Sequence, residues 1–262
     1  MTSARAYPLE RERNIILVVL LALAAIAWAV TVWYAGRDEA MSMAPTMGMS
    51  TLLFLTIWTT MMAAMMFPTG APMIMVFARI HRDKQAKGKP YVPTWIFVSS
   101  YMVMWVLFGV LAYLLAVGGE RLAEQSMWIM DNAARLGAGL LILAGIYQLT
   151  PLKYACLSKC RSPVQFIMTS WRDGYAGSFR MGLEHGAYCL GCCWMLFVIL
   201  FPLGMMNIAA MAVITLLIFA EKSLPWGVRV SRIAAVALIV YGVTVLASPE
   251  LLPTVMDNGM DM

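Results

Sequence analysis

Long runs of apolar residues dominate the chain, and short polar segments separate them. A helix needs about 20 mostly apolar residues to cross the hydrocarbon core of a bilayer. The pattern predicts an all-α, polytopic membrane helix bundle with about seven transmembrane helices, which forms one integral membrane domain over residues 1–262. The seven windows are 14–35, 50–77, 94–117, 131–149, 182–202, 206–220 and 228–248. The sixth is short and follows a tight connection at 202–207, so the fifth and sixth are either a helical hairpin or a partly re-entrant segment.

Lysine and arginine concentrate in alternate connections between these windows. If the N-terminal segment 1–13 is cytoplasmic, the inner segments hold 16 of the 19 Lys and Arg residues and the outer segments hold three. The inner segments are 1–13, 78–93, 150–181 and 221–232, and the outer segments are 36–49, 118–136 and 249–262. The positive-inside rule therefore predicts a cytoplasmic N-terminus and an outer C-terminus. The same distribution explains the net charge of +5 through membrane lipid, and no nucleic-acid partner is needed.

Composition supports a membrane protein without a separate soluble domain. The chain is 61% hydrophobic and 13% charged, whereas a soluble domain carries roughly 25% charged residues. There is no internal repeat, glycine-rich phosphate loop or nucleotide motif, and no set of catalytic or cofactor-binding residues is recognised. These features argue against an enzyme and against pumping driven by ATP within this chain.

Methionine is abundant, with 24 residues, and the second window carries four of them near its middle. Met61 and Met65 lie about 40° apart on a helix, as do Met62 and Met66, so the four sulfurs share one face. Pro68, which follows at once, predicts a kink in this helix. Methionine is a flexible gap filler in apolar cores, and its thioether is also a soft ligand for Cu(I). Both interpretations of this face remain open.

Two segments assigned to the outer side are also rich in methionine. The loop 36–49 and the Met- and Asp-rich tail 249–262 have no core to fill, so spaced thioethers there predict a secondary outer site for a soft metal ion. Its candidate ligands are Met41, Met43, Met47, Met49, Met260 and Met262. The alternatives are chance in a Met-rich protein, packing of the tail on the membrane face, and oxidation sensing through Met sulfoxide.

The fifth window places a histidine and three cysteines on one helix face. Relative to His185, the offsets of Cys189, Cys192 and Cys193 are about 40°, −20° and 80°, so the four residues fit within about 100° of arc. Cysteine and methionine suit Cu(I), and cysteine with histidine also suits zinc. The pattern predicts a buried metal site that Met61, Met62, Met65 or Met66 completes. A free cysteine is also commonly a small buried hydrophobe, and a histidine can simply bridge two helices.

The motif His-x₃-Cys-x₂-Cys-Cys-Trp at 185–194 resembles a bacterial family of uncharacterised, predicted metal-binding integral membrane proteins. The segments Trp58–Pro68 and Glu221–Pro225 share in this resemblance, which covers roughly residues 50–245. It implies metal binding and hints at copper handling. The predicted location of the protein is the bacterial cytoplasmic (inner) membrane. The Met-rich loop and tail lie mostly outside the matched region.

The function predicted on these grounds is binding, delivery or transport of Cu(I), with zinc as the second candidate metal and a periplasmic metal chaperone or a membrane complex as the candidate partner. One alternative is a membrane thiol–disulfide oxidoreductase that uses Cys189 and Cys192 as a C-x-x-C pair. The expected outer cysteine pair is absent from the sequence. Another alternative is an accessory or assembly subunit of a membrane complex, in which the cluster is structural.

Three further features involve charged or thiol side chains near the inner ends of the windows. Cys156 and Cys160 are spaced i, i+4 and are interpretable as a reactive thiol pair, a metal exit point or incidental surface cysteines. Glu221 and Lys222 are expected to pair with each other, because charges within a span usually pair or line a pathway. Glu184 is expected to pair with Arg180 at i, i+4.

Overall fold

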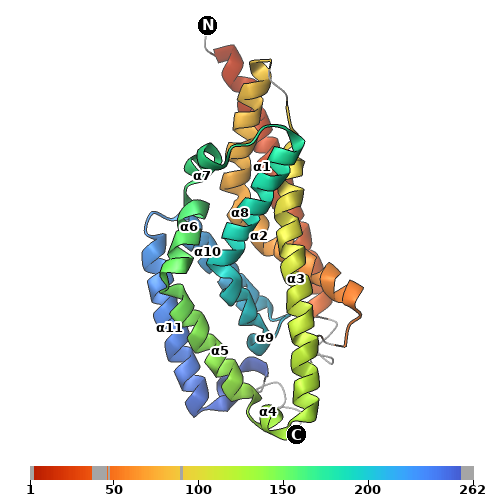
Figure 1. Ribbon diagram of the computed structural model, residues 1–262, viewed down its shortest axis with the longest axis vertical. Helices are drawn as coiled ribbons and strands as arrows, with labels where there is room; N and C mark the ends of the chain where they lie inside the picture. Colours follow the sequence, from red (N-terminus) through yellow and green to blue (C-terminus); the bar gives the residue numbers. More distant parts are fainter. Residues whose placement is uncertain (1–2, 37–45, 47, 89–90, 255–262) are drawn as a thin grey trace.

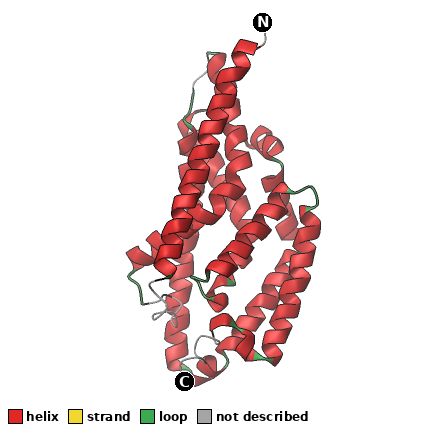
Figure 2. Ribbon diagram, turned by 180° about the vertical axis from the view of Figure 1, so that it is seen from behind, coloured by secondary structure: helices red, strands yellow, loops and turns green. Residues whose placement is uncertain are grey.

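The computed structural model describes residues 3–36, 46, 48–88 and 91–254 of the 262-residue chain. Its described residues form helices joined by short loops, and they contain no strand (Figure 2). The all-α prediction is therefore confirmed. The long helices are α1 (Ser3–Ala35), α2 (Thr51–Ala86), α3 (Thr94–Gln125), α5 (Ala133–Gln148), α8 (Gly174–Val198), α10 (Ile208–Ser223) and α11 (Gly227–Ala247). The shorter ones are α4 (Met127–Asp131), α6 (Pro151–Arg161), α7 (Pro163–Ser170), α9 (Leu200–Leu203) and a 3₁₀ turn at Pro249–Leu251.

Five of the described helical segments are long and apolar enough to cross a membrane. They are Arg13–Ala35, Thr51–Ala86, Thr94–Gln125, Gly174–Leu203 and Gly227–Ala247. A sixth arises if α5 and α6, which meet at an angle of 63°, count as one broken span. The predicted windows 131–149 and 206–220 correspond to α5 and α10, which have 16 residues each. Such a helix is about 24 Å long, shorter than a hydrocarbon core of about 30 Å, so the seventh span remains a prediction.

Local sequence explains where several helices begin. The Ser50 hydroxyl caps α2 by accepting from the Leu53 amide at 3.4 Å, and the Asn207 side chain caps α10 by accepting from the Ala210 amide at 3.0 Å. Thr150 caps α6, and Pro151 follows at its first position. Proline has no amide proton to donate and cannot continue α5, so the chain turns here and starts a new helix.

Helix α2 lies at the centre of the bundle. It packs against α1, α3 and α10. Helix α8 packs against α3 and α6, and α5 pairs with α11 at the lower left of Figure 1. Of the most apolar stretch of α2, 72% is buried, compared with 22% in α1 and in α11. The outer helices leave large apolar side chains exposed, such as Leu115 at 66% and Ile233 at 69%. Exposed apolar surface of this extent is typical of a surface that faces lipid.

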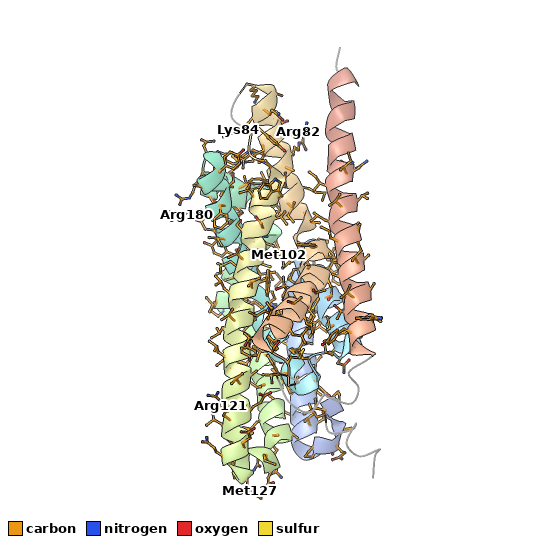
Figure 3. The ribbon with its side chains drawn as sticks, turned by 90° about the vertical axis from the view of Figure 1, so that its right-hand side faces the viewer. Arg82, Lys84, Met102, Arg121, Met127 and Arg180 are labelled. Carbon is orange, nitrogen blue, oxygen red and sulfur yellow. The ribbon has the colours of Figure 1, made fainter. Side chains whose placement is uncertain are left out.

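Charged residues separate along the long axis of the bundle. Arg82, Lys84 and Arg180 lie at one end, and Arg121 lies at the other (Figure 3). This separation agrees with the assignment of 78–93 and 150–181 to one side and of 118–136 to the opposite side. Which of the two ends is cytoplasmic remains a prediction.

Small residues allow α3 and α8 to approach closely. A side chain at Gly182 would place its Cβ 2.5 Å from the Phe97 carbonyl oxygen and 1.9 Å from the Ser100 hydroxyl oxygen. Contacts between real Cβ atoms and their neighbours are rarely shorter than 3.0 Å, so only glycine fits at this crossing. The close crossing sets the distance between α3 and the histidine and cysteines that follow on α8.

Candidate metal site

The four predicted residues of α8 are all buried in the bundle. His185 is 3% exposed, Cys189 is fully buried, and Cys192 and Cys193 are each 1% exposed. The Cys192 thiol donates to the Cys189 carbonyl oxygen at 3.1 Å, and the Cys193 thiol donates to the same oxygen at 2.8 Å. Two of the three thiols thus turn back towards the backbone of their own helix.

His185 is the least satisfied polar side chain of this group. No described residue forms a hydrogen bond with either of its ring nitrogens. Its ring lies among Phe97, Tyr101 and Phe166, with centroid distances of 5.8, 5.3 and 5.6 Å. A buried polar atom without a partner costs about 1–3 kcal/mol. The predicted alternative of a histidine that bridges two helices through a hydrogen bond is therefore not seen among the described residues.

Two polar groups from other helices approach the Cys189 sulfur. The Lys222 ammonium, from α10, donates to it at 3.0 Å, and the Tyr101 hydroxyl, from α3, lies 3.2 Å away. Hydrogen bonds to an ionised group are roughly twice as strong as neutral ones. A cysteine binds metals as its thiolate, and a lysine cation at this distance can pair with such a group. Neither residue was identified as part of the site from sequence, because the contacts form between helices distant along the chain.

The expected pairing of Glu221 with Lys222 is wrong. Glu221 instead accepts from the Lys153 ammonium, which lies 2.8 Å from both carboxylate oxygens, and the side chains of this pair are 1% and 0% exposed. Adjacent residues on a helix point about 100° apart, so Glu221 and Lys222 face different neighbours. The expected pair of Arg180 and Glu184 is present at 3.2 Å.

A fourth thiol joins the cluster from α6. Cys160 is 8% exposed, and its thiol interacts with those of Cys189 and Cys192. Its interpretation as an incidental surface cysteine is therefore wrong. Cys156 is half-buried and lies on the other side of α8, where its sulfur is 2.7 Å from the position of a Cβ added at Gly191. Helix α6 packs along α8, and this packing could not be read from the i, i+4 spacing of the two cysteines.

A cavity of about 200 Å³ adjoins the cluster. Its walls come from α2, from the corner between α6 and α7, from α8 and from α10. The lining residues are Thr69, Pro72, Met73, Cys160, Arg161, Pro163, His185, Lys222 and Ser223. His185 and Cys160, two soft or borderline metal ligands, thus share one hollow with a lysine cation.

The four methionines of α2 are fully buried and belong to the same continuous apolar core as the cysteines of α8. None of Met61, Met62, Met65 and Met66 lines the cavity, whereas Met73 from the same helix does. The Met66 sulfur accepts from the Thr69 hydroxyl at 3.8 Å. The structure therefore gathers the predicted thioethers and thiols in one core, with the cavity displaced along α2 towards Met73.

A family model described as copper chaperone (PpoB2) matches residues 55–245, which is nearly three quarters of the chain. The chain belongs to the copper chaperone family. The matched region includes α2 from Leu55, all of α3–α10 and most of α11, and therefore contains every residue of the thiol cluster. No curated protein and no solved structure matches the chain.

The thiols, thioethers and imidazole of this cluster are ligand types that suit a soft metal ion. Among the described residues, however, no three His, Cys, Asp or Glu side chains form a group that could hold a metal ion. The orientation of Cys192 and Cys193 towards the Cys189 carbonyl accounts for part of this, because their sulfurs do not point to a common centre.

The secondary outer site lies almost wholly outside the described residues. Met41, Met43, Met47, Met260 and Met262 fall in the segments that the structure does not describe. Met49 is described and is 7% exposed, and its sulfur accepts from the Tyr34 hydroxyl at 3.9 Å. It belongs to the same apolar core as the methionines of α2. Of the predicted outer ligands, Met49 is therefore a core residue, and the other five remain predictions.

Proposed function

We propose that this copper chaperone family member is a multi-pass protein of the bacterial cytoplasmic membrane that binds Cu(I) at the thiols of Cys189, Cys192 and Cys160. Copper is the cargo in this proposal. The observation that carries it is the Lys222 ammonium at 3.0 Å from the Cys189 sulfur, next to a buried His185 whose ring nitrogens form no hydrogen bond with any described residue. This combination supplies soft ligands and a nearby positive charge in one buried place.

Charge balance explains why a lysine would accompany a copper site. If two of the three sulfurs bind as thiolates and the third stays a neutral thiol, the sulfurs and one Cu(I) ion carry a net charge of minus one, and an uncompensated charge is costly to bury. The Lys222 ammonium brings the total to zero. The Tyr101 hydroxyl, 3.2 Å from the Cys189 sulfur, can donate to the same thiolate. In a purely structural core, a lysine placed against a cysteine would not add to the free energy of folding.

The remaining groups have supporting roles in this proposal. His185 supplies an imidazole nitrogen at the wall of the cavity, and the methionines of α2 supply neutral thioethers in the adjoining core. Thioethers add no charge, so copper can pass among them at low electrostatic cost. Met73 lines the cavity and would be the first thioether available to an ion held by Cys160 or His185. The outer methionines and a periplasmic metal chaperone would then supply or receive the ion.

The test is copper stoichiometry of protein purified anaerobically in detergent and loaded with Cu(I) under reductant. We expect the variants Cys189→Ser and Cys192→Ser to lose the buried copper and His185→Ala to bind it more weakly. Cys156→Ser is the matched control, because Cys156 is a neighbouring thiol that is only half-buried and lies against Gly191, on the other side of α8. Stoichiometry unchanged in the first three variants would refute this site, and an equal loss in the control would show a nonspecific thiol effect.

The same preparations separate the alternative functions. A membrane thiol–disulfide oxidoreductase predicts that a mixed disulfide can be trapped through Cys189 or Cys192, with activity independent of copper. An assembly subunit predicts a co-purified partner that the Cys189→Ser variant retains. Either result, together with unchanged copper content, would favour that alternative over copper handling.

A further inference from the structure

The cavity beside the thiol cluster carries more positive charge than the proposed copper site uses. Lys222 and Arg161 both line it, and no carboxylate lines it in the described part of the chain. Glu221, the acid next to Lys222 in sequence, directs both carboxylate oxygens to the Lys153 ammonium at 2.8 Å. In the proposed copper site Lys222 balances the bound sulfurs, so the charge of Arg161 is in surplus.

The guanidinium of Arg161 is fixed at the cavity by the end of α10. It donates to the carbonyl oxygens of Glu221, Leu224 and Pro225 at 2.6, 2.8 and 3.1 Å. These three bonds leave two of the five guanidinium N–H donors. Neutral carbonyl oxygens orient the group without cancelling its charge, and a charge withdrawn from water is costly without a counter-ion. An anion in the cavity would lower this cost.

The cavity opens to the surface and has soft ligands in its inner wall. Ser223 is exposed at the end of α10 and Arg161 is half-buried, so the opening lies beside the loop between α10 and α11. The inner wall holds Cys160 and His185, and no described residue forms a hydrogen bond with the ring nitrogens of His185. The volume of about 200 Å³ corresponds to about seven water molecules. A small organic molecule fits this space.

We propose that this cavity exchanges Cu(I) as an anionic complex with a small thiol that carries a carboxylate, with Arg161 as the carboxylate partner and Cys160 as the first protein ligand. This inference rests on the proposed copper site. Two cations repel a bare Cu(I) ion, whereas Cu(I) with two thiolates already carries a charge of minus one. The planar fork of an arginine matches a carboxylate, and a charged cleft concentrates ligands of opposite charge.

The exchange leaves copper as Cu(I). The Cys160 sulfur forms a bond to copper, one bond between copper and a thiolate of the complex breaks, and the Cys160 proton passes to that leaving thiolate. A neutral small thiol departs, and the net charge of the copper complex stays at minus one. A second exchange of the same kind, with the Cys189 thiol, moves copper into the buried cluster and releases the second small thiol.

The test follows copper transfer to purified full-length protein in detergent without oxygen. The donors are preformed Cu(I) complexes of mercaptopropionate, mercaptoethanol and cysteamine, whose free ends are anionic, neutral and cationic. Rapid gel filtration separates protein from donor, and the copper in the protein fraction gives the transfer rate. A long incubation with the acetonitrile complex of Cu(I) gives the copper content at equilibrium, which tests the copper site by itself.

One added charge at the opening probes the attraction. Ser223→Glu should slow transfer from the mercaptopropionate complex on the order of fivefold at low ionic strength, and less in concentrated salt. It should not slow transfer from the cysteamine complex. Ser158→Glu is the matched control, because it adds the same charge at an exposed position of α6 that does not line the cavity. Rates in this control should equal those of wild type for each donor.

Two substitutions of Arg161 separate its charge from its bonds to the end of α10. Arg161→Gln removes the charge and should slow the anionic donor more than the cationic one. Arg161→Lys keeps the charge with fewer donors and should retain most of the wild-type rate. Comparison of each donor with itself across variants cancels differences in the strength of its copper–sulfur bonds.

The outcomes separate this inference from the proposed copper site. An unchanged mercaptopropionate rate in Ser223→Glu, or equal slowing of all three donors, would overturn the role of charge at the opening. Equal slowing of the mercaptopropionate complex in Ser158→Glu would show a general effect of net charge and would also overturn it. Either result with full copper content at equilibrium refutes the exchange inference alone. Wild-type protein that takes up no copper from the acetonitrile complex would refute both.

Discussion

The crossing of α3 and α8 at Gly182 offers a direct test of how packing positions the thiol cluster. The change Gly182→Ala adds one Cβ, which would lie 2.5 Å from the Phe97 carbonyl oxygen. Ordinary van der Waals contact begins near 3.4 Å, so the two backbones must separate by about 0.9 Å. The Ser100 hydroxyl, which donates to the same carbonyl at 2.9 Å, must also move.

The energetic cost follows from these contacts. Overpacking of a well-packed core costs about 1–3 kcal/mol, and replacing glycine by alanine inside a helix returns about 0.5–1 kcal/mol. The expected net loss of unfolding free energy is therefore on the order of 1–2 kcal/mol. The separation also pulls the Tyr101 hydroxyl on α3 away from the Cys189 sulfur on α8, now 3.2 Å apart. We expect weaker Cu(I) binding as well as lower stability.

The assay combines thermal unfolding in detergent, followed by circular dichroism, with competition for Cu(I) against a chromogenic chelator. Gly118→Ala is the matched control, because Gly118 lies on α3 and a Cβ added there meets no atom within 4 Å. This control should unfold at an equal or higher temperature and bind copper as wild type does. If Gly182→Ala raised the unfolding temperature as much as Gly118→Ala, the inferred close crossing would be wrong.

Three further predictions concern buried polar groups. Lys153→Met breaks the buried pair with Glu221 and should lower the unfolding free energy by about 3–5 kcal/mol. The double variant that also carries Glu221→Leu should regain most of this loss. Denaturant titrations that show equal stability of the single and double variants would contradict this prediction. Tyr101→Phe should weaken Cu(I) binding by about fivefold through loss of the hydroxyl beside Cys189, and a chelator competition showing wild-type affinity would exclude that contribution. Lys222→Met should weaken Cu(I) binding by more than tenfold, consistent with loss of a charged hydrogen bond, while Lys222→Arg retains part of it; unchanged affinity in Lys222→Met would rule out charge compensation.

The apolar windows located the main helices well but not their ends. Helix α2 continues to Ala86 and α3 to Gln125, beyond the predicted limits at 77 and 117, and α8 begins at Gly174 rather than at 182. Apolar windows follow only the part of a helix that needs a hydrocarbon surrounding, whereas the backbone hydrogen bonds continue into polar sequence. The windows at 131–149 and 206–220 correspond to α5 and α10, which are not among the five described segments long and apolar enough to cross a membrane by themselves.

Helical spacing identified the face of α8 that the structure buries, because residues at i, i+3 and i+4 share a face whatever lies opposite. What lies opposite could not be read in this way. Lys222 and Cys160 approach Cys189 from α10 and α6, which are tens of residues away along the chain. The break at Pro151, which lets α6 turn and pack along α8, was the only local signal that this segment returns to the core.

The central claim is that sulfur from α8 holds Cu(I) in the buried cluster. X-ray absorption at the copper edge, on anaerobically loaded protein, tests it most directly by comparing wild type with the double variant Cys189→Ser and Cys192→Ser. We expect a first shell dominated by sulfur in wild type and loss of that shell in the variant. A shell of nitrogen and oxygen in wild type, or a sulfur shell unchanged in the variant, would contradict the proposed site.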